Sequence, residues 1–549
     1  MSHKSPISNV AFLIPPIVGV MLYFQVLHHD YIHFDDALYT YNNSYVSSGL
    51  SWDNVCWAFS DFRIANYHPL TLISHSLDFE LFGNSPGVFA FVNVLFHAVN
   101  SFFLLILFRC LGVSKTNAIL LSIVFVCHPV LVEGVAWISQ RKSVMASFFF
   151  LPSVILYIKV LKNESVINKR FYLSLSVLMY VFSLLSKATY VTMPLLLVFV
   201  EYIVNDGFEM RSDDRFRRIG HLILRLIPYV VFSFVICILT YFAQVDDGAV
   251  SNVNEVSVFE RIQCVIYGYF WHFVHFIYPD NLSIIYPFIR GVSIYLTMFQ
   301  AMVLVLVSFL VFKYRKISCG KVMIGWLFFL FSLVPMIGFI SIGWHMYADR
   351  YMYGPIIGLL LMLSGVMESI VSKYTGLRVT FWFRIGFGLW VLFLAVLCYF
   401  HIGTWKSSSL IVYNAYSNGI RHELVDSMLV SDLLEKGEYG VAKEICENGI
   451  ENGYLNGLFL HYLAVCELNL NNLDKAIEWQ ERYVSATNDR RQSGLPFLAR
   501  LYFESGRIEE AIAVFDHAAA LNSSDPADVA IMESLREGIQ RHREMRDDP

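Results

Sequence analysis

Residues 10–36 read VAFLIPPIVGVMLYFQVLHHDYIHFDD, an apolar run from Val10 to Leu27 that is soon followed by two adjacent carboxylates, Asp35 and Asp36. A helix crosses the hydrocarbon core of a bilayer in about 20 residues, so the run is long enough to span it. No small-residue cleavage site follows the run, and we therefore expect a retained helix and not a signal peptide. The carboxylates would then stand at one face of a membrane.

The composition of the whole chain is that of a polytopic membrane protein. Of its 549 residues, 56% are hydrophobic, 16% are aromatic and 15% are charged, whereas soluble domains are about 25% charged. The nine cysteines show no metal-ligand spacing and give no redox signal. Nucleic acid is excluded as a partner, because the basic residues of the hydrophobic part face predicted cytoplasmic lipid headgroups.

Hydropathy and charge together predict an all-α membrane bundle over residues 1–405, with a long first outer loop at 29–87. If Lys4 lies inside, every predicted inside loop is basic, as Lys and Arg bias short loops to the cytoplasm. An odd number of spans then places the C-terminal region outside. About eleven spans are predicted, near residues 10–28, 88–109, 116–132, 143–161, 171–187, 189–205, 221–243, 292–312, 322–342, 351–372 and 380–402.

The C-terminal region has a different composition and an internal period. Small residues recur at Ala442, Ala476 and Ala511, close to the period of about 34 residues of tetratricopeptide repeats. We predict a linker helix at 406–422 and an α-solenoid at 423–549, with about three repeats and a capping helix. Such a stack can form a groove for an extended peptide, and the alternatives are a structural cap or a dimer contact.

The acidic pair in the first outer loop has three interpretations. Two adjacent carboxylates repel each other and raise at least one pKa, which suits a general base that deprotonates an attacking hydroxyl. Asp36 can instead cap a helix that begins at Ala37. The third interpretation is a site for a divalent cation, because such ions prefer oxygen ligands.

Basic residues and histidines stand at the outer ends of other predicted helices. Arg and Lys there can bind the phosphate of a lipid-linked donor, or their side chains can snorkel to the headgroups. The residues are Arg141, Lys142, Lys187 and Arg350. His68-Pro69 and His128-Pro129 each place an imidazole at a helix break, where it either lines a site or is structural.

Several of these motifs resemble one family. Phe34-Asp35-Asp36-Ala37 resembles the first-loop acidic motif of GT-C membrane glycosyltransferases. More specific runs resemble the transmembrane and tetratricopeptide repeat-containing O-mannosyltransferases and their bacterial relatives. These runs are Asn66-Tyr67-His68-Pro69, His128-Pro129 with Glu133, Arg141-Lys142, Leu185-Ser186-Lys187, Tyr286-Pro287 and Ala348-Asp349-Arg350-Tyr351. The resemblance covers nearly the whole membrane region, and the repeats follow in the expected order.

The resemblance implies transfer of a sugar from a polyprenyl (undecaprenyl- or dolichyl-type) monophosphate to Ser or Thr hydroxyls of proteins, with inversion and without a cofactor. Asp35 becomes the expected general base, supported by Asp36. The expected phosphate-binding residues are Arg350, Lys187, Arg141 and Lys142, and the expected sugar- or acceptor-binding residues are His68, His128, Glu133, His345, Asp349 and Tyr286. The repeats would present the acceptor polypeptide.

The short repeat array favours a bacterial inner-membrane protein with its active site and repeats in the periplasm, or the endoplasmic reticulum membrane if the chain is eukaryotic. Departures from the family pattern at Tyr67, Leu131, Gln140 and Gly354 leave sugar and acceptor choice open. The alternatives are a glycan or lipid acceptor, and a non-catalytic scaffold that recruits partners through its repeats. Transport is disfavoured, because the ionisable residues gather at helix ends and not at the bilayer midplane.

Overall fold

The structure is a computed structural model, and it describes residues 10–62, 66–204, 215–246, 257–287, 292–314, 320–338, 347–373, 377–454, 457–486, 494–520 and 526–547. The chain divides into two compact units, residues 1–411 and residues 412–549, and each is described by itself. Within the described ranges, every regular element is a helix, which confirms the predicted all-α class.

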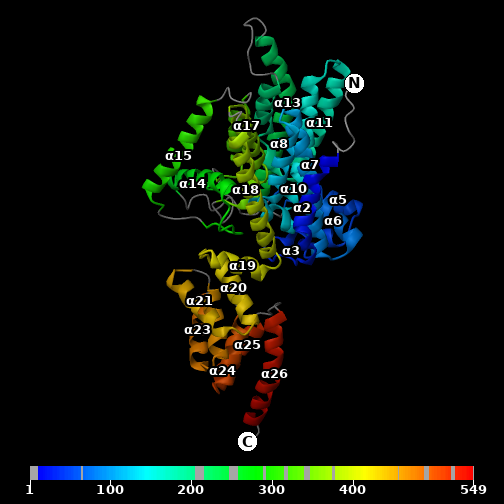
Figure 1. The fold of residues 1–549 in the computed structure, drawn as a ribbon. Helices are drawn as coiled ribbons and strands as arrows, with labels where there is room; N and C mark the ends of the chain where they lie inside the picture. Colours follow the sequence, from blue (N-terminus) through cyan, green and yellow to red (C-terminus); the bar gives the residue numbers. More distant parts are fainter. Residues whose placement is uncertain are drawn as a thin grey trace. The chain divides into compact units, whose positions relative to one another are not determined.

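The first unit is a helix bundle in which α2 and α8 pack on α7, α7 packs on α10, and α10 packs on α11 (Figure 1). Its elements are η1 (Ala11–Leu13), α2 (Ile14–Tyr23), η2 (Phe24–His28), α3 (Asp36–Tyr39), α4 (Ser44–Ser47), α5 (Trp52–Ser60), α6 (Pro69–Phe82), α7 (Pro86–Cys110), α8 (Lys115–Cys127), η3 (Pro129–Leu131), α9 (Val132–Ala136), η4 (Ile138–Gln140), α10 (Arg141–Lys162), α11 (Val166–Ser186), η5 (Ala188–Tyr190), α12 (Met193–Val204), α13 (Arg215–Asp246), α14 (Val258–Ile277), α15 (Ile294–Lys313), α16 (Lys321–Leu333), η9 (Asp349–Tyr353), α17 (Ile356–Lys373) and α18 (Leu377–Thr404).

Seven helices among the described residues are long and apolar enough to cross a membrane, or eight if the bent pair α8 and α9 forms one span. The chain is therefore an integral membrane protein, but the count of eleven spans is not confirmed. Helices α12 and α16 fall in the class of shorter apolar helices, and α11 is not among the seven. The bent pair turns by 57° around His128-Pro129, where proline cannot continue the helical hydrogen bonding.

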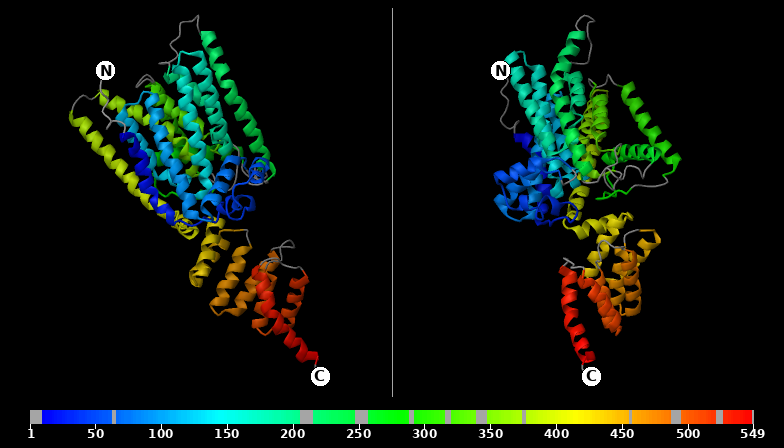
Figure 2. Two further views of the ribbon diagram at one scale, coloured as in Figure 1. Left: turned by 90° about the vertical axis from the view of Figure 1, so that its right-hand side faces the viewer. Right: turned by 180° about the vertical axis from the view of Figure 1, so that it is seen from behind.

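The first outer loop is a small helical layer with its own core, and it gathers at one end of the bundle (blue in Figure 2). Tyr39, Val46, Ala58 and Leu72 form that core. Helix α6 buries Thr71, His75 and Asp78 against the protein, while Leu77 and Leu81 are exposed. This inversion fits a helix that turns its apolar face to lipid, as a helix lying in the membrane interface does.

The outer segment between the predicted spans 221–243 and 292–312 contains the 20-residue helix α14, which was not predicted. Helix α14 runs crosswise to α17 in Figure 1 and packs against α15. It begins with a capping box at Ser257 and Glu260. Its polar residues Gln263 and His272 are buried within the protein, and this amphipathic pattern hid the helix from a search for apolar spans.

The second unit is a stack of paired helices. Its elements are α19 (Ser408–Ser417, which begins just before the boundary), α20 (Glu423–Glu435), α21 (Tyr439–Glu451), α22 (Leu458–Asn469), α23 (Leu473–Ala486), α24 (Leu495–Glu504), α25 (Ile508–Ala520) and α26 (Pro526–Asp547). The small residues of the predicted period, Ala442, Ala476 and Ala511, are all fully buried between helices. The period therefore reflects close helix packing.

Helices α16 and α17 approach each other through two glycines. A methyl group at Gly358 would lie 2.5 Å from the carbonyl oxygen of Gly325 and 2.6 Å from the amide nitrogen of Phe329. Between helices in lipid, hydrophobic burial adds no driving force, so association depends on close packing. Small residues such as glycine allow the two backbones to approach this closely.

We expect Gly358→Ala to destabilise the bundle, because backbone atoms of α16 would have to move. The expected loss in free energy of unfolding is about 1–3 kcal/mol. Thermal unfolding of the full chain in detergent measures it. Gly388→Ala in α18 is the control, since a methyl group there meets nothing within 4 Å, and equal effects of the two variants would contradict the close-contact interpretation.

Candidate active site

The two carboxylates of the acidic pair have different surroundings. Asp36 is fully buried, and its Oδ2 accepts a hydrogen bond of 2.8 Å from the amide of Ile32. Its Oδ1 accepts from the amide of Ser139 at 2.9 Å and also from the Ser139 hydroxyl. Both oxygens are thus engaged, so the pair does not present two open carboxylates to a cation. Asp36 joins the first outer loop to the η4 segment.

Asp35 faces outward beside this anchor. Its side chain is 43% exposed, and its Oδ2 lies 3.7 Å from the Nζ atom of Lys142. Asp35 is the N-cap residue of α3, yet its side chain makes no capping hydrogen bond. The helix-cap interpretation concerned Asp36, and the geometry disfavours it because the Asp36 oxygens accept from Ile32 and Ser139 and not from α3. Asp35 is left as an accessible carboxylate next to Lys142.

Lys142 is held over an aromatic pair. Its Nζ donates to the hydroxyl of Tyr39 at 3.1 Å and lies 4.3 Å from the centre of the Tyr39 ring. Tyr39 in turn stacks on His68, with ring centres 5.1 Å apart. Burial, then Lys142 and Lys187, lowers the pKa of His68 well below its usual range, so this imidazole is neutral. Among the described residues, its Nε2 has no hydrogen-bond partner.

Two further cations approach from other elements. Lys187, at the end of α11, donates to the hydroxyl of Ser143 at 2.8 Å. Arg350, on η9, pairs with the fully buried Glu133 through a contact of 2.5 Å, and its amide also donates to Glu133 at 2.7 Å. Asp35 lies within electrostatic range of Lys142, Lys187 and Arg350. The structure thus brings together one accessible carboxylate and three basic side chains from separate elements.

Arg141 does not belong to this cluster of charged side chains. Its side chain is fully buried and forms an ion pair of 2.6 Å with Asp78. Its guanidinium also donates to Ser74 at 2.8 Å, to the carbonyl of Phe89 at 2.9 Å and to the side chain of Asn93. All three nitrogens are engaged, so the geometry favours a structural role for Arg141 over phosphate binding.

Two of the predicted sugar-binding residues join segments of the protein. Asp349 is buried, and its carboxylate accepts from the Tyr286 hydroxyl at 3.0 and 3.1 Å. Burial, with the nearby Glu133, raises the pKa of Asp349 well above its usual range. The hydroxyl of Tyr286 also accepts from the amide of Ser283 at 2.8 Å. This bridge fixes η9 and with it Arg350. His345 lies outside the described residues.

His128 is a structural histidine by its contacts. It is fully buried and stacks on Phe276 with ring centres 5.6 Å apart. Its Nδ1 accepts from the amide of Val130 at 3.4 Å, and its Nε2 lies 3.0 Å from the carbonyl of Phe276. No ring nitrogen is left for a sugar, which favours the structural interpretation over the predicted pocket role.

Some residues that shape the site were not among the predicted ones. Ser139 donates hydrogen bonds to Asp36, and Tyr39 accepts one from Lys142. Asp78 forms the ion pair with Arg141. Trp137 is buried beneath Arg350, 5.7 Å from its guanidinium, and its Nε1 has no hydrogen-bond partner among the described residues. Tyr39, Trp137 and Ser139 lie within a few residues of the motifs quoted above, which was the available signal, whereas Asp78 lies outside them.

Fold and site together define an integral membrane protein in which an accessible carboxylate lies beside a cluster of basic side chains. Tetratricopeptide-repeat family models match residues 427–491 and residues 497–525, which confirms the predicted repeats. The chain is similar to the protein O-mannosyl-transferase TMTC2 of Homo sapiens, with 28% identity over 27% of this chain and 19% of the relative. It is also similar to the protein O-mannosyl-transferase TMTC3 of Mus musculus, with 31% identity over 17% of this chain and 10% of the relative. A third similar protein is TMTC4 of Mus musculus, with 26% identity over 33% of this chain and 28% of the relative.

These matches are consistent with the resemblance to the transmembrane and tetratricopeptide repeat-containing O-mannosyltransferases that the motifs indicate. The aligned segments span less than a third of the length of these relatives.

We expect Asp78→Asn to destabilise the chain strongly, because it leaves the buried guanidinium of Arg141 without its counter-charge. Removal of one partner of a buried ion pair costs about 3–5 kcal/mol of unfolding free energy. Thermal or denaturant unfolding in detergent measures the loss. Asp280→Asn is the control, since the Asp280 side chain is 45% exposed beside His275 and an exposed pair is worth at most about 1 kcal/mol.

The titration of Asp36 gives a second prediction. Burial raises its pKa to about 6, against the opposing hydrogen bonds from Ser139 and Ile32, whereas an unfolded Asp has a pKa of about 3.9. The folded chain therefore binds more protons between these values, and the free energy of unfolding falls as pH rises through this window, by up to about 3 kcal/mol. Above pH 6 the contribution is constant.

Asp36→Asn removes this ionisation. The difference in melting temperature between parent and variant, measured from pH 4 to pH 7, should change with pH, because the parent loses stability relative to the variant as pH rises. The loss of the hydrogen bond from Ile32 adds a cost to the variant that does not depend on pH. Parallel curves would show that Asp36 does not titrate in this range.

Proposed function

We propose that the chain is a membrane glycosyltransferase that moves a sugar from a polyprenyl-monophosphate donor to Ser or Thr hydroxyls of proteins. The observation that carries the proposal is the exposed carboxylate of Asp35 beside Lys142 and within electrostatic range of Lys187 and Arg350. A general base next to a cluster of cations suits a reaction in which a hydroxyl attacks and a phosphate leaves. The similar proteins are named O-mannosyl-transferases, so mannose is the first sugar to test.

In the proposed reaction, Asp35 takes the proton of the acceptor hydroxyl while the hydroxyl oxygen attacks the anomeric carbon. The bond between this carbon and the phosphate oxygen breaks, and the electron pair leaves with the polyprenyl phosphate. Attack from the face opposite the phosphate inverts the anomeric centre. Lys142, Lys187 and Arg350 would stabilise the charge that grows on the phosphate, since ammonium and guanidinium groups bind phosphate oxygens strongly.

The buried groups would hold this arrangement in place. Asp36 directs Asp35 outward, Glu133 orients Arg350, and Tyr39 supports Lys142. His68 is the best placed of the predicted sugar-binding residues, because its neutral ring lies under Tyr39 with Nε2 unpartnered among the described atoms. A neutral imidazole can both donate to and accept from sugar hydroxyls.

The repeats support a protein as the acceptor. Tetratricopeptide repeats form surfaces for other proteins, and the similar proteins are named for transfer to protein. The charge distribution of the loops supports a site on the extracytoplasmic side, which is the periplasm in a bacterium.

Asp35→Asn should reduce transfer at least about 100-fold, because an amide cannot take the proton. The assay supplies purified full-length chain with polyprenyl-phosphate mannose and an acceptor polypeptide rich in Ser and Thr, and it measures glycopeptide by mass spectrometry. Asp53→Asn is the matched control, since Asp53 is an exposed carboxylate of the same loop, on α5. The control should transfer sugar at the rate of the parent chain.

The other interpretations give different results in this assay. Full activity of Asp35→Asn would exclude a catalytic role for Asp35. Transfer to glycan or lipid acceptors, with no glycopeptide formed, would support the alternative acceptor. A parent chain that consumes no donor but retains protein partners through its repeats would support the scaffold.

A further inference from the structure

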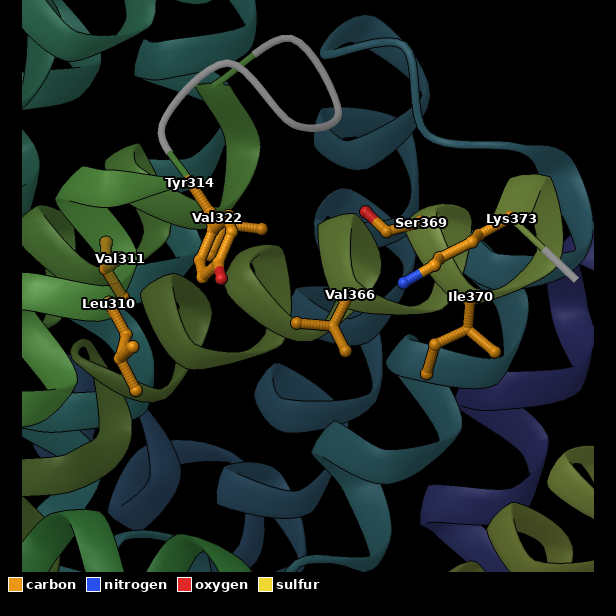
Figure 3. A pocket seen from close by; sticks show the side chains of 8 residues that line it. All are labelled: Leu310, Val311, Tyr314, Val322, Val366, Ser369, Ile370 and Lys373. Carbon is orange, nitrogen blue, oxygen red and sulfur yellow. The ribbon is translucent and has the colours of Figure 1, made fainter.

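A cavity of about 360 Å³ lies between α15, α16 and α17, away from the site described above. Pockets for small molecules usually measure about 300–1,000 Å³. Figure 3 shows its lining, which comes from Leu310, Val311 and Tyr314 of the α15 end, from Val322 of α16, and from Val366, Ser369, Ile370 and Lys373 of α17. The lining is almost entirely hydrocarbon, so the cavity suits an apolar group.

The cavity is open toward the surroundings of the bundle. Leu310, Tyr314 and Val366 line it and are 42%, 49% and 38% exposed. The helices α15 and α17 are both apolar enough to cross a membrane. Side chains that such helices expose face lipid, and lipid acyl chains are therefore the apolar groups with direct access to the cavity.

One end of the cavity is cationic. Lys373 is the last residue of α17, and in Figure 3 its side chain reaches back toward Val366 and Ser369. Lys313 ends α15 and lies 5.7 Å from the ring centre of Tyr314. Lys and Tyr at the end of a span mark the level of the headgroups. The nearby Lys321 pairs with Glu368 at 2.9 Å, and Lys373 is a further basic residue at the rim.

We propose that this cavity holds an acyl chain of an anionic phospholipid, whose phosphate lies against Lys373. An apolar cavity open to lipid selects the chain, and a cation at headgroup depth selects the charge of the headgroup.

The lipid site is separate from the proposed transferase site. Arg350 stands just before α17, and Lys373 is the last residue of this 18-residue helix. A helix of that length spans about 27 Å. Lipid binding here does not depend on sugar transfer, so either proposal can fail without the other.

Native mass spectrometry of the full chain in detergent tests the proposal. After lipid removal, the chain is titrated with phosphatidylglycerol or with phosphatidylcholine of the same acyl chains. We expect one saturable phosphatidylglycerol site and at least about five-fold weaker binding of phosphatidylcholine. Lys373→Gln should weaken phosphatidylglycerol binding about five-fold, and Val366→Trp, which fills the cavity, should abolish the saturable site.

Two matched controls should bind as the parent chain does. Lys169→Gln removes an exposed charge from α11 on the same predicted side of the membrane, and Leu392→Trp adds a ring to α18 at a residue that is 60% exposed. Lys373→Gln alters one exposed side chain at a helix end and should not disturb folding. It therefore tests the lipid site even if Val366→Trp fails to fold. Equal affinity for both lipids, unchanged binding in Lys373→Gln, or displacement of phosphatidylglycerol by polyprenyl phosphate would overturn the proposal.

Discussion

The candidate site depends on one buried carboxylate. Asp36 accepts hydrogen bonds from Ile32 at its own end of the first outer loop and from Ser139 just before α10, and so it ties two distant segments together. Successive residues at the start of a helix point about 100° apart. Because Asp36 is held inward, Asp35 has to face outward, toward Lys142. The position of the exposed carboxylate is thus a consequence of the buried one.

The other two charged dipeptides, Arg141-Lys142 and Asp349-Arg350, also consist of one residue in buried structural contacts and one residue at the candidate site. On α10, Arg141 is buried in its contacts with Asp78 and Asn93, while the neighbouring Lys142 reaches Asp35. On η9, Asp349 is buried against Tyr286, while Arg350 reaches Glu133 at the candidate site. In each pair, one charged residue binds its helix to a neighbouring segment. This contact fixes the direction in which the adjacent charged side chain points. A membrane protein gains from this arrangement, since a buried charge without a partner is costly.

Sequence reasoning found the charged dipeptides but not which member of each faces the candidate site. Motif and topology placed Asp35, Lys142, Lys187 and Arg350 on one predicted face, and the structure brings them together. The inward roles of Arg141 and Asp349 depend on the phase of a short helix and on partners such as Asp78, which lies far from Arg141 in the chain. Likewise, α14 escaped prediction because its polar face is buried in protein, so its hydropathy is not that of a span.

The charges at the candidate site also bear on the direction of the proposed reaction. With Asp349 in its protonated form, which its raised pKa favours, and the other groups ionised, Lys142, Lys187 and Arg350 are balanced by Asp35, Asp36 and Glu133. When Asp35 takes a proton from the acceptor hydroxyl, one negative charge disappears from the cluster. At that moment the departing phosphate gains one, so the three cations face the leaving group with fewer competing carboxylates. Groups fixed in place before the reaction stabilise this charge without reorganisation. The buried carboxylates of Asp36 and Glu133 contribute to this preorganisation, because each is held in place by a hydrogen bond from a backbone amide. A carboxylate without such a bond would not be fixed before the reaction.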